Sequence, residues 1–273
     1  MSPNGRQPAE SARLPVAAGD QGAPSKKIAE TDAIFDNIDA ARERARLDPH
    51  CLRISIDGKA QVSIGPFSRR GRTRGKKSLK ACDHDTGAVA KLRPFGVLEV
   101  TRGEQEIQQL WLAFGHSRET SDFIVDVLER WWSERRGSHP GVRRLQIELD
   151  NGPQLSGTRT QFLKRLQAFA DQYELEIELV YFPPYHSKYN PIEHCWGALE
   201  QHWNGTLLTS IETALKWAGT MTWKGLAPIV REVQGIYARG VRVAKAAFRS
   251  IAARIKRSAT LPKWHITIKP MPP

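Results

Sequence analysis

Apolar and polar residues alternate in several short runs of this chain, the pattern of strands that bury one face. Two of the runs are near-duplicates, Leu52-Arg-Ile-Ser-Ile-Asp57 and Leu145-Gln-Ile-Glu-Leu-Asp150, and each ends on an aspartate. The remaining runs that predict strands lie at 60–65, 94–101 and 176–182, and a further apolar run at 107–114 is left unassigned.

Between and around these runs the apolar spacing becomes helical. A leading helix is predicted over 31–47, and three further helices are marked by Phe123 to Trp131, by 158–173 and by Ile192 to Trp203. The resulting order, βββ-αβαβα, is that of the ribonuclease-H-like α/β fold with a mixed central sheet. In that fold the first strand lies in mid-sheet beside the fourth, which brings their ends together.

The composition divides the chain into four segments. Residues 1–27 contain almost no large apolar side chains and are predicted to be a disordered tail. A linker with the leading helix follows at 28–50, then the ribonuclease-H-like catalytic domain at 51–208. Residues 209–273 are predicted to form a basic helical extension.

The charge of the chain is concentrated in two places. The net charge is +12, yet Pro66–Lys80 alone carries +7 and Arg231–Lys263 carries +8. Such concentration is typical of a chain that docks on a polyanion. No run of about 18 apolar residues and no apolar secretion segment is present, so we expect a soluble, cytoplasmic protein.

The three cysteines, Cys51, Cys82 and Cys195, form no C-x-x-C pair and predict neither a disulfide framework nor a usual zinc site. A second acidic cluster, Asp83-His84-Asp85, competes with Asp57 for a metal role, but Asp85-Thr-Gly87 is more typical of a turn.

Three carboxylates carry the candidate chemistry: Asp57, Asp150 and Glu193. Taken singly, the two aspartates are explained as turn residues at strand ends, and Glu193 as part of a helix start after Asn190-Pro191. Taken together, they fall on the elements that one fold brings together. Mg²⁺ prefers such oxygen ligands, and three acids suffice for two Mg²⁺ (or Mn²⁺) ions, the arrangement that cleaves and transfers phosphodiesters.

Other residues have accessory or binding roles in this interpretation. Asn151, His186 and Lys188 lie on loops predicted near the carboxylates. His186 or Lys188 would contact the scissile phosphate or orient a water, and a structural hydrogen bond explains each of these two equally well. The basic loop, residues Ser68–Lys80, is predicted to contact DNA phosphates through Arg69, Arg70, Arg72, Arg74, Lys76, Lys77 and Lys80.

Many separate strings of the chain resemble the ISAzo-thirteen group of bacterial insertion-sequence transposases, within the DDE transposase/integrase superfamily. They include Phe67-Ser-Arg-Arg-Gly71, Glu119-Thr-Ser-Asp-Phe123, Tyr181-Phe-Pro-Pro-Tyr-His-Ser-Lys-Tyr-Asn-Pro-Ile-Glu193 and Met221-Thr-Trp-Lys-Gly225. The resemblance runs from about residue 28 to 268. It implies that Asp57, Asp150 and Glu193 are the catalytic, metal-binding triad.

The resemblance also implies a function and partners. The expected activity is Mg²⁺-dependent hydrolysis of DNA at transposon ends and strand transfer into target DNA, by a homo-oligomer. Full-length relatives carry a helix-turn-helix region before the catalytic domain, whereas about 50 residues precede the first strand here, so we expect a truncated copy. Two alternatives remain: a decayed or domesticated transposase that only binds DNA, and a ribonuclease-H-like nuclease.

Overall fold

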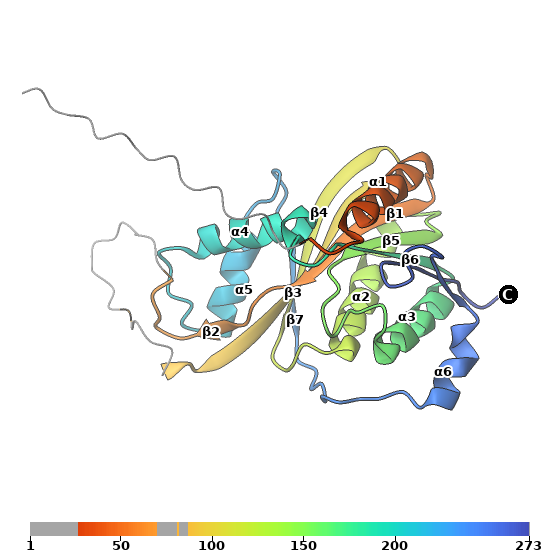
Figure 1. Cartoon of the computed structure of the whole chain (residues 1–273). Coiled ribbons are helices and arrows are strands. Elements are labelled where there is room, and N and C mark those ends of the chain that lie inside the picture. Colours follow the sequence, from red (N-terminus) through yellow and green to blue (C-terminus); the bar gives the residue numbers. More distant parts are fainter. Residues whose placement is uncertain (1–26, 70–80, 82–86, 273) are drawn as a thin grey trace, which may run out of the picture.

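A mixed β-sheet forms the centre of the molecule (Figure 1). The structure, a computed structural model, describes residues 27–69, 81 and 87–272. Within this part nine strands share the sheet in the order β7-β4-β3-β1-β5-β6-β9-β8, and β2 pairs with β3 outside this path. The strands are β1 Cys51–Gly58, β2 Val62–Ile64, β3 Ala90–Arg102, β4 Gln105–Gly115, β5 Arg144–Leu149, β6 Glu176–Tyr181, β7 Ile229–Val233, β8 Ile255–Arg257 and β9 His265–Ile268.

Helices cover both faces of this sheet. Figure 1 shows α2 and α3 on one side, with α4 and α5 on the other. The described helices are α1 Thr31–Leu47, α2 Ser121–Arg135, α3 Thr160–Tyr173, α4 Pro191–Trp203, α5 Ile211–Thr220 and α6 Lys245–Ala252, with short 3-10 turns at Arg136–Ser138 and Ser187–Tyr189. None of these helices is long and apolar enough to cross a membrane.

The alternating pattern of the strands explains how the sheet is buried. Apolar residues such as Ile54 and Ile147 pack with Phe162 of α3 in one core cluster. A second cluster joins β3 and β4 to α4 and α5 and contains Leu98 and Trp203. The central strands β4-β3-β1-β5-β6 confirm the predicted ribonuclease-H-like arrangement, with β1 antiparallel to β3 and parallel to β5.

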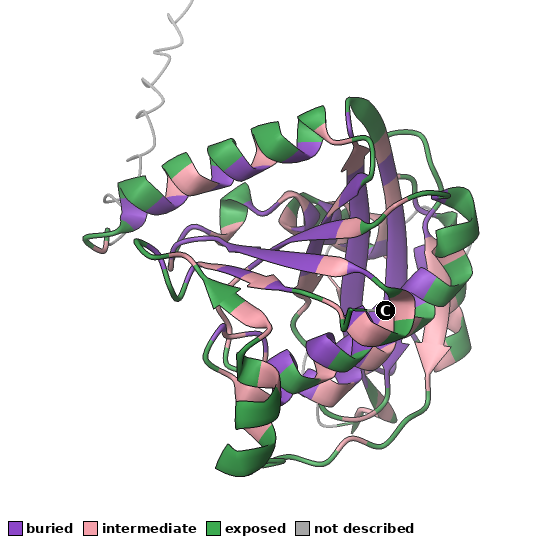
Figure 2. Ribbon diagram, turned by 90° about the vertical axis from the view of Figure 1, so that its right-hand side faces the viewer, coloured by how far each residue is buried: buried purple, intermediate pink, exposed green. Residues whose placement is uncertain are grey.

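The leading helix α1 is held on the sheet partly by buried ion pairs. Arg42 of α1 and Arg53 of β1 lie 2.7 and 2.9 Å from the carboxylate of Glu148, whose side chain is fully buried. Burial alone would raise the pKa of Glu148, but the two arginines outweigh it and lower that pKa. In Figure 2, α1 is the long helix at the top, exposed along its outer side, above largely buried strands.

The C-terminal segment 209–273 differs from the predicted helical extension. It contains the helices α5 and α6, and in addition three strands that the pattern does not predict. Strand β7 pairs parallel with β4 at one edge of the sheet, whereas β9 pairs antiparallel with β6 and carries β8 at the other. Strands of three to five residues contain too few alternations to be recognised, because their pairing partner fixes their conformation.

Candidate active site

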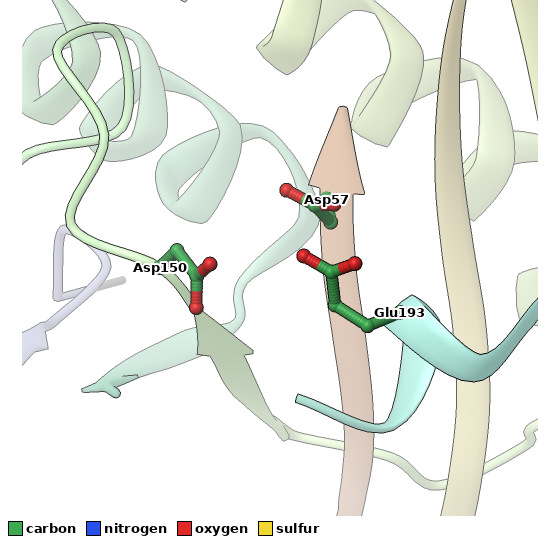
Figure 3. A group of neighbouring side chains, drawn as sticks. All are labelled: Asp57, Asp150 and Glu193. Atoms are coloured by element: carbon green, nitrogen blue, oxygen red, sulfur yellow. The ribbon is translucent and has the colours of Figure 1, made fainter. Parts of the chain in front are cut away.

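The three candidate carboxylates meet at the carboxyl ends of the central strands β1 and β5 (Figure 3). Strands β1 and β5 run parallel with Leu52 opposite Leu145 and Ser55 opposite Glu148. The same register places Asp57 opposite Asp150, at the carboxyl ends of both strands. One oxygen from each of Asp57, Asp150 and Glu193 lies within 4.8 Å of the others.

Helix α4 places Glu193 beside the carboxyl ends of β1 and β5. Pro191 occupies the start of the helix, where a missing N–H costs nothing, and Glu193 lies in the first turn. The preceding Asn190 is fully buried, and its side chain does not cap the helix. Instead its amide accepts a hydrogen bond from Ser55 Oγ at 2.5 Å and donates one to the Ile56 carbonyl at 3.3 Å. Asn190 therefore fastens the start of α4 to β1.

A glycine makes the close approach of α4 possible. Gly96 of β3 lies opposite Asp57 in the sheet. A Cβ atom at this position would lie 2.6 Å from the Ile192 Cδ1 atom and 2.9 Å from the Trp196 ring, well inside van der Waals contact. A larger residue at position 96 would push α4, and Glu193 with it, away from β1.

Burial and mutual repulsion raise the proton affinity of the two aspartates. Burial is the larger cause, and with the charge of Glu193 it raises the pKa of Asp57 to about 7 and that of Asp150 to about 6. A hydrogen bond from Trp196 Nε1 to Asp57 Oδ2, 3.0 Å long, opposes the shift at Asp57. Asn190 opposes it at Asp150. Such perturbed carboxylates are typical of functional sites.

The donor set fits a hard divalent cation. All the converging ligand atoms are carboxylate oxygens, which Mg²⁺ and Mn²⁺ prefer. Asp150 Oδ1 is buried and has no hydrogen-bond partner among the described residues. A buried acceptor without a partner is costly in a fold unless something else satisfies it. A cation held by Asp57, Asp150 and Glu193 would satisfy this oxygen and offset the repulsion among the three acids.

This electrostatic arrangement predicts a pH-dependent effect of metal on stability. Because the folded-state pKa values lie above the ordinary 3.8, the site's contribution to stability is fully present below about pH 4 and is lost as the pH rises through about 6 to 7. We expect the thermal midpoint of metal-free protein to fall between about pH 5 and pH 8. Mg²⁺ or Mn²⁺ should raise it at pH 8 and much less at pH 5, since protons compete for the ligands.

Differential scanning fluorimetry of the wild type and an Asp57→Asn/Asp150→Asn variant measures this effect. The variant should show a flatter pH dependence and a much smaller metal shift. An equal metal shift in both proteins would mean that the ion binds elsewhere.

The contacts of the three predicted accessory residues differ. Asn151 follows Asp150 directly, and its Oδ1 atom is buried without a hydrogen-bond partner among the described residues. His186 is buried, lies 2.7 Å from the Pro184 carbonyl through Nδ1 and packs against Phe35. Lys188 is exposed above the Tyr189 ring. These contacts favour a structural role for His186, and the catalytic role of all three stays a prediction.

Of the cations predicted to contact DNA in the basic loop, only Arg69 lies within the described residues. Its Nη2 atom is 3.0 Å from Glu200, and its guanidinium lies over the Trp203 ring. Substituting Arg69 would therefore also remove an ion pair of the fold. Arg70, Arg72, Arg74, Lys76, Lys77 and Lys80 lie outside the described residues, as do Cys82, Asp83, His84 and Asp85.

Sequence reasoning missed several residues that shape the site. Ser55 and Trp196 contact the site through hydrogen bonds to Asn190 and Asp57, and both look like ordinary pattern positions in the sequence. Glu119 is a further half-buried acid beside Gly58, where an added Cβ would meet its carboxylate at 2.4 Å. Burial raises the pKa of Glu119, and the charge of Arg93 opposes this.

Comparisons with known proteins agree with this architecture. The matching family model describes the Rhodopirellula transposase DDE domain and covers residues 18–270. No curated protein matches the chain.

Among solved structures, the Mos1 transposase paired-end complex with the left transposon end is similar at a TM-score of 0.50 and 10% identity, over 74% of this chain and 57% of that one. The Mos1 mariner paired-end complex with Mn gives 0.47 and 12%, over the same shares. At 10% identity the likeness to the first of these structures concerns the fold alone. The chain spans 57% of the length of these two solved transposase chains.

Proposed function

The chain belongs to the family of the Rhodopirellula transposase DDE domain, and from this premise we propose that it is a catalytic domain for DNA transposition. In this proposal it hydrolyses a phosphodiester at each element end and transfers the freed 3′-hydroxyl to target DNA. Its partners would be element-end and target DNA, bound by a homo-oligomer.

The convergence of Asp57, Asp150 and Glu193 carries the proposal. The three acids come from β1, the end of β5 and the first turn of α4, and their oxygens lie within 4.8 Å of one another. Gathering three acids in a partly buried site costs stability, as the raised pKa values of both aspartates indicate. A fold that keeps such a costly arrangement is better explained by cation binding than by packing.

Asp57, Asp150 and Glu193 would hold two Mg²⁺ or Mn²⁺ ions. Such ions, when bound, supply positive charge to the phosphoryl oxygens and activate the attacking oxygen. The chain's own residues hold the carboxylates in place: Trp196 fixes one oxygen of Asp57, and Asn190 ties the start of α4 to β1.

The reaction needs no covalent intermediate with the protein. In the first step a water oxygen bonds to phosphorus while the bond from phosphorus to the 3′ oxygen breaks, and that oxygen leaves as a 3′-hydroxyl. In the second step this hydroxyl bonds to a target phosphorus and displaces the 3′ oxygen of the target strand. The role of the site is positioning and charge.

The main alternative is a decayed or domesticated transposase that binds DNA without cutting it. Its basic residues would suffice for binding, but it needs no convergent carboxylates. A ribonuclease-H-like nuclease uses the same site chemistry and differs in substrate, so comparing matched duplexes, hybrids and junctions separates it from a transposase.

Incubation of the purified chain with supercoiled plasmid tests the proposal. We expect nicking in Mg²⁺ or Mn²⁺ and none in EDTA, because the carboxylates act through bound cations. The Asp57→Ala/Asp150→Ala variant should not nick under any of these conditions. Metal-dependent nicking that survives in this variant would refute the assignment of the site, and DNA binding without nicking by the wild type would favour the DNA-binding alternative.

A further inference from the structure

A polar cavity of about 220 Å³ lies where the starts of α2 and α3 meet the segment between β7 and α6. Its walls include Thr120, Gln154, Arg159, Gln161, Arg239 and Val241. These residues come from three parts of the chain that are far apart in sequence. The cavity is therefore a product of the fold and not of a single loop.

The cavity lies near the ends of the strands that carry the carboxylates. Gln154 belongs to the loop that leaves β5 after Asp150, and its carbonyl accepts a hydrogen bond from Ser121 Oγ at 2.8 Å. Four residues of chain span at most about 14 Å, and one DNA strand carries a phosphate about every 3.4 Å along the helix axis. Gln154 thus lies within about 14 Å of Asp150, close enough for a single DNA duplex to contact both the cavity and the carboxylates.

Two arginines give the cavity a positive charge. Neither Arg159 nor Arg239 has an ion-pair partner among the described residues. The Nε atom of Arg159 is buried without a hydrogen-bond partner in the same part of the chain, and its Nη2 reaches only the Val241 carbonyl, at 3.4 Å. These guanidinium groups are free to bind an anion.

The acid in the cavity wall, Asp122, already has a cationic partner in Arg165, which also pairs with Asp126 and Glu129. Asp122 Oδ1 accepts hydrogen bonds from Gln161 Nε2 at 2.7 Å and from Arg165 Nη1 at 3.0 Å. The wall from the C-terminal segment, residues 238–241, contains Arg239 and no acid.

We propose that the Arg159/Arg239 cavity binds a backbone phosphate of the DNA duplex beside the phosphodiester that is cleaved. This inference rests on the proposed function, since it assigns the DNA to a path across the cavity. A guanidinium donates two parallel hydrogen bonds to a phosphate, which fixes the position of the strand as well as its affinity. The contact would set the register of DNA on the carboxylates without reading its sequence.

Fluorescence anisotropy of a labelled duplex, measured over a range of salt concentrations in EDTA, tests this contact. Each lost phosphate contact should lower the slope of log K against log[salt] by about 0.9. We expect Arg159→Gln and Arg239→Gln each to weaken binding by several-fold to about tenfold, and the double variant to lower the slope by about 1. The exposed residue Arg239 offers a variant with little risk to folding.

The matched control is Arg143→Gln, which removes the same charge from an exposed arginine just before the opposite end of β5. A six-residue strand is about 20 Å long, so this residue lies far from the cavity. Photocrosslinking from duplexes with azidophenacyl groups on phosphorothioates locates the contact. We expect crosslinked peptides that contain Gln154 to Arg159 or Arg239 to Val241.

The outcomes separate this inference from the proposed function. The inference alone would be overturned by three results together. The wild type nicks DNA in a metal-dependent way, the variants at Arg159 and Arg239 bind DNA as Arg143→Gln does, and no crosslinks form at the cavity. Absence of both DNA binding and nicking in the wild type would overturn both proposals. A thermal shift by inorganic phosphate, lost in the double variant, together with unchanged DNA binding would show a site for free phosphate and refute the DNA contact.

Discussion

Replacing Asp150 with asparagine is expected to abolish metal-dependent DNA cleavage while the protein stays folded and binds DNA. The substitution keeps the size of the side chain but removes the charge of an oxygen that is buried and has no other hydrogen-bond partner among the described residues. The nicking rate should fall by more than the roughly 100-fold that is seen when a group that only supports a metal ligand is changed. Single-turnover nicking in Mg²⁺ or Mn²⁺ measures it.

The same variant should be more stable than the wild type in the absence of metal. At pH 8 the wild type carries an ionised Asp150 whose pKa is raised to about 6 by burial and by Glu193. Removing that charge should stabilise the fold by about 1 kcal/mol, since one pKa unit corresponds to ~1.4 kcal/mol and partial exposure screens part of the shift. Urea unfolding in EDTA provides the measurement. Lost activity with increased stability identifies a residue kept for function.

The control for this experiment is Asp36→Asn, the same change at an exposed aspartate of α1. It should alter neither nicking nor metal-free stability beyond a few tenths of a kcal/mol. If Asp150→Asn nicks DNA at the wild-type rate, or if it fails to bind DNA, Asp150 is not the metal ligand that we propose.

The sequence predicts that the two aspartates lie side by side, because both end near-duplicate strand patterns that are visible in the chain. The near-duplicate runs that end at Asp57 and Asp150 prove to be neighbours, paired parallel with Leu52 opposite Leu145. Alternation identifies each strand, and the βββ-αβαβα order places them side by side. The helix that carries Glu193 follows from its apolar spacing in the same way.

Contacts between distant elements explain what the sequence does not predict. Arg69 looks like one more cation of a basic loop, yet it is held by Glu200 and by the ring of Trp203. Strands β7 and β9 are too short for a periodic signal and take their conformation from β4 and β6. The cavity at Arg159 and Arg239 joins segments 80 residues apart, a proximity that only the tertiary fold creates.

Asn190 is the clearest case, because the sequence predicts its position but not its task. It precedes a helix that begins with proline, which is typical of an N-cap, yet its side chain bonds to β1 and not to the helix. Ser55 Oγ, which donates to Asn190, also accepts from the Ile192 N–H at 3.1 Å. This buried network sets the distance between the start of α4 and the end of β1, and so between Glu193 and Asp57.

Substituting Asn190 with alanine should therefore weaken both stability and metal binding. Leaving Ser55 and the Ile56 carbonyl without their buried partner should cost about 1–3 kcal/mol. Nicking should fall about 10- to 100-fold, the range seen when a group that orients a metal ligand is lost. The Mn²⁺ concentration for half-maximal nicking should rise in parallel, and high Mn²⁺ should restore part of the rate.

The rise in metal requirement distinguishes positioning from a general loss of stability. Gln167→Ala is the matched control, because Gln167 of α3 is also a buried amide and lies away from the carboxylates. Its side chain donates hydrogen bonds to Asp171 and to the Lys269 carbonyl. It should lose similar stability and keep the wild-type Mn²⁺ requirement. If both variants change the metal requirement equally, or if neither does, Asn190 acts only on the fold. A shift confined to Asn190→Ala shows that the metal site depends on the hydrogen bonds of Asn190 to β1 and to Asp150.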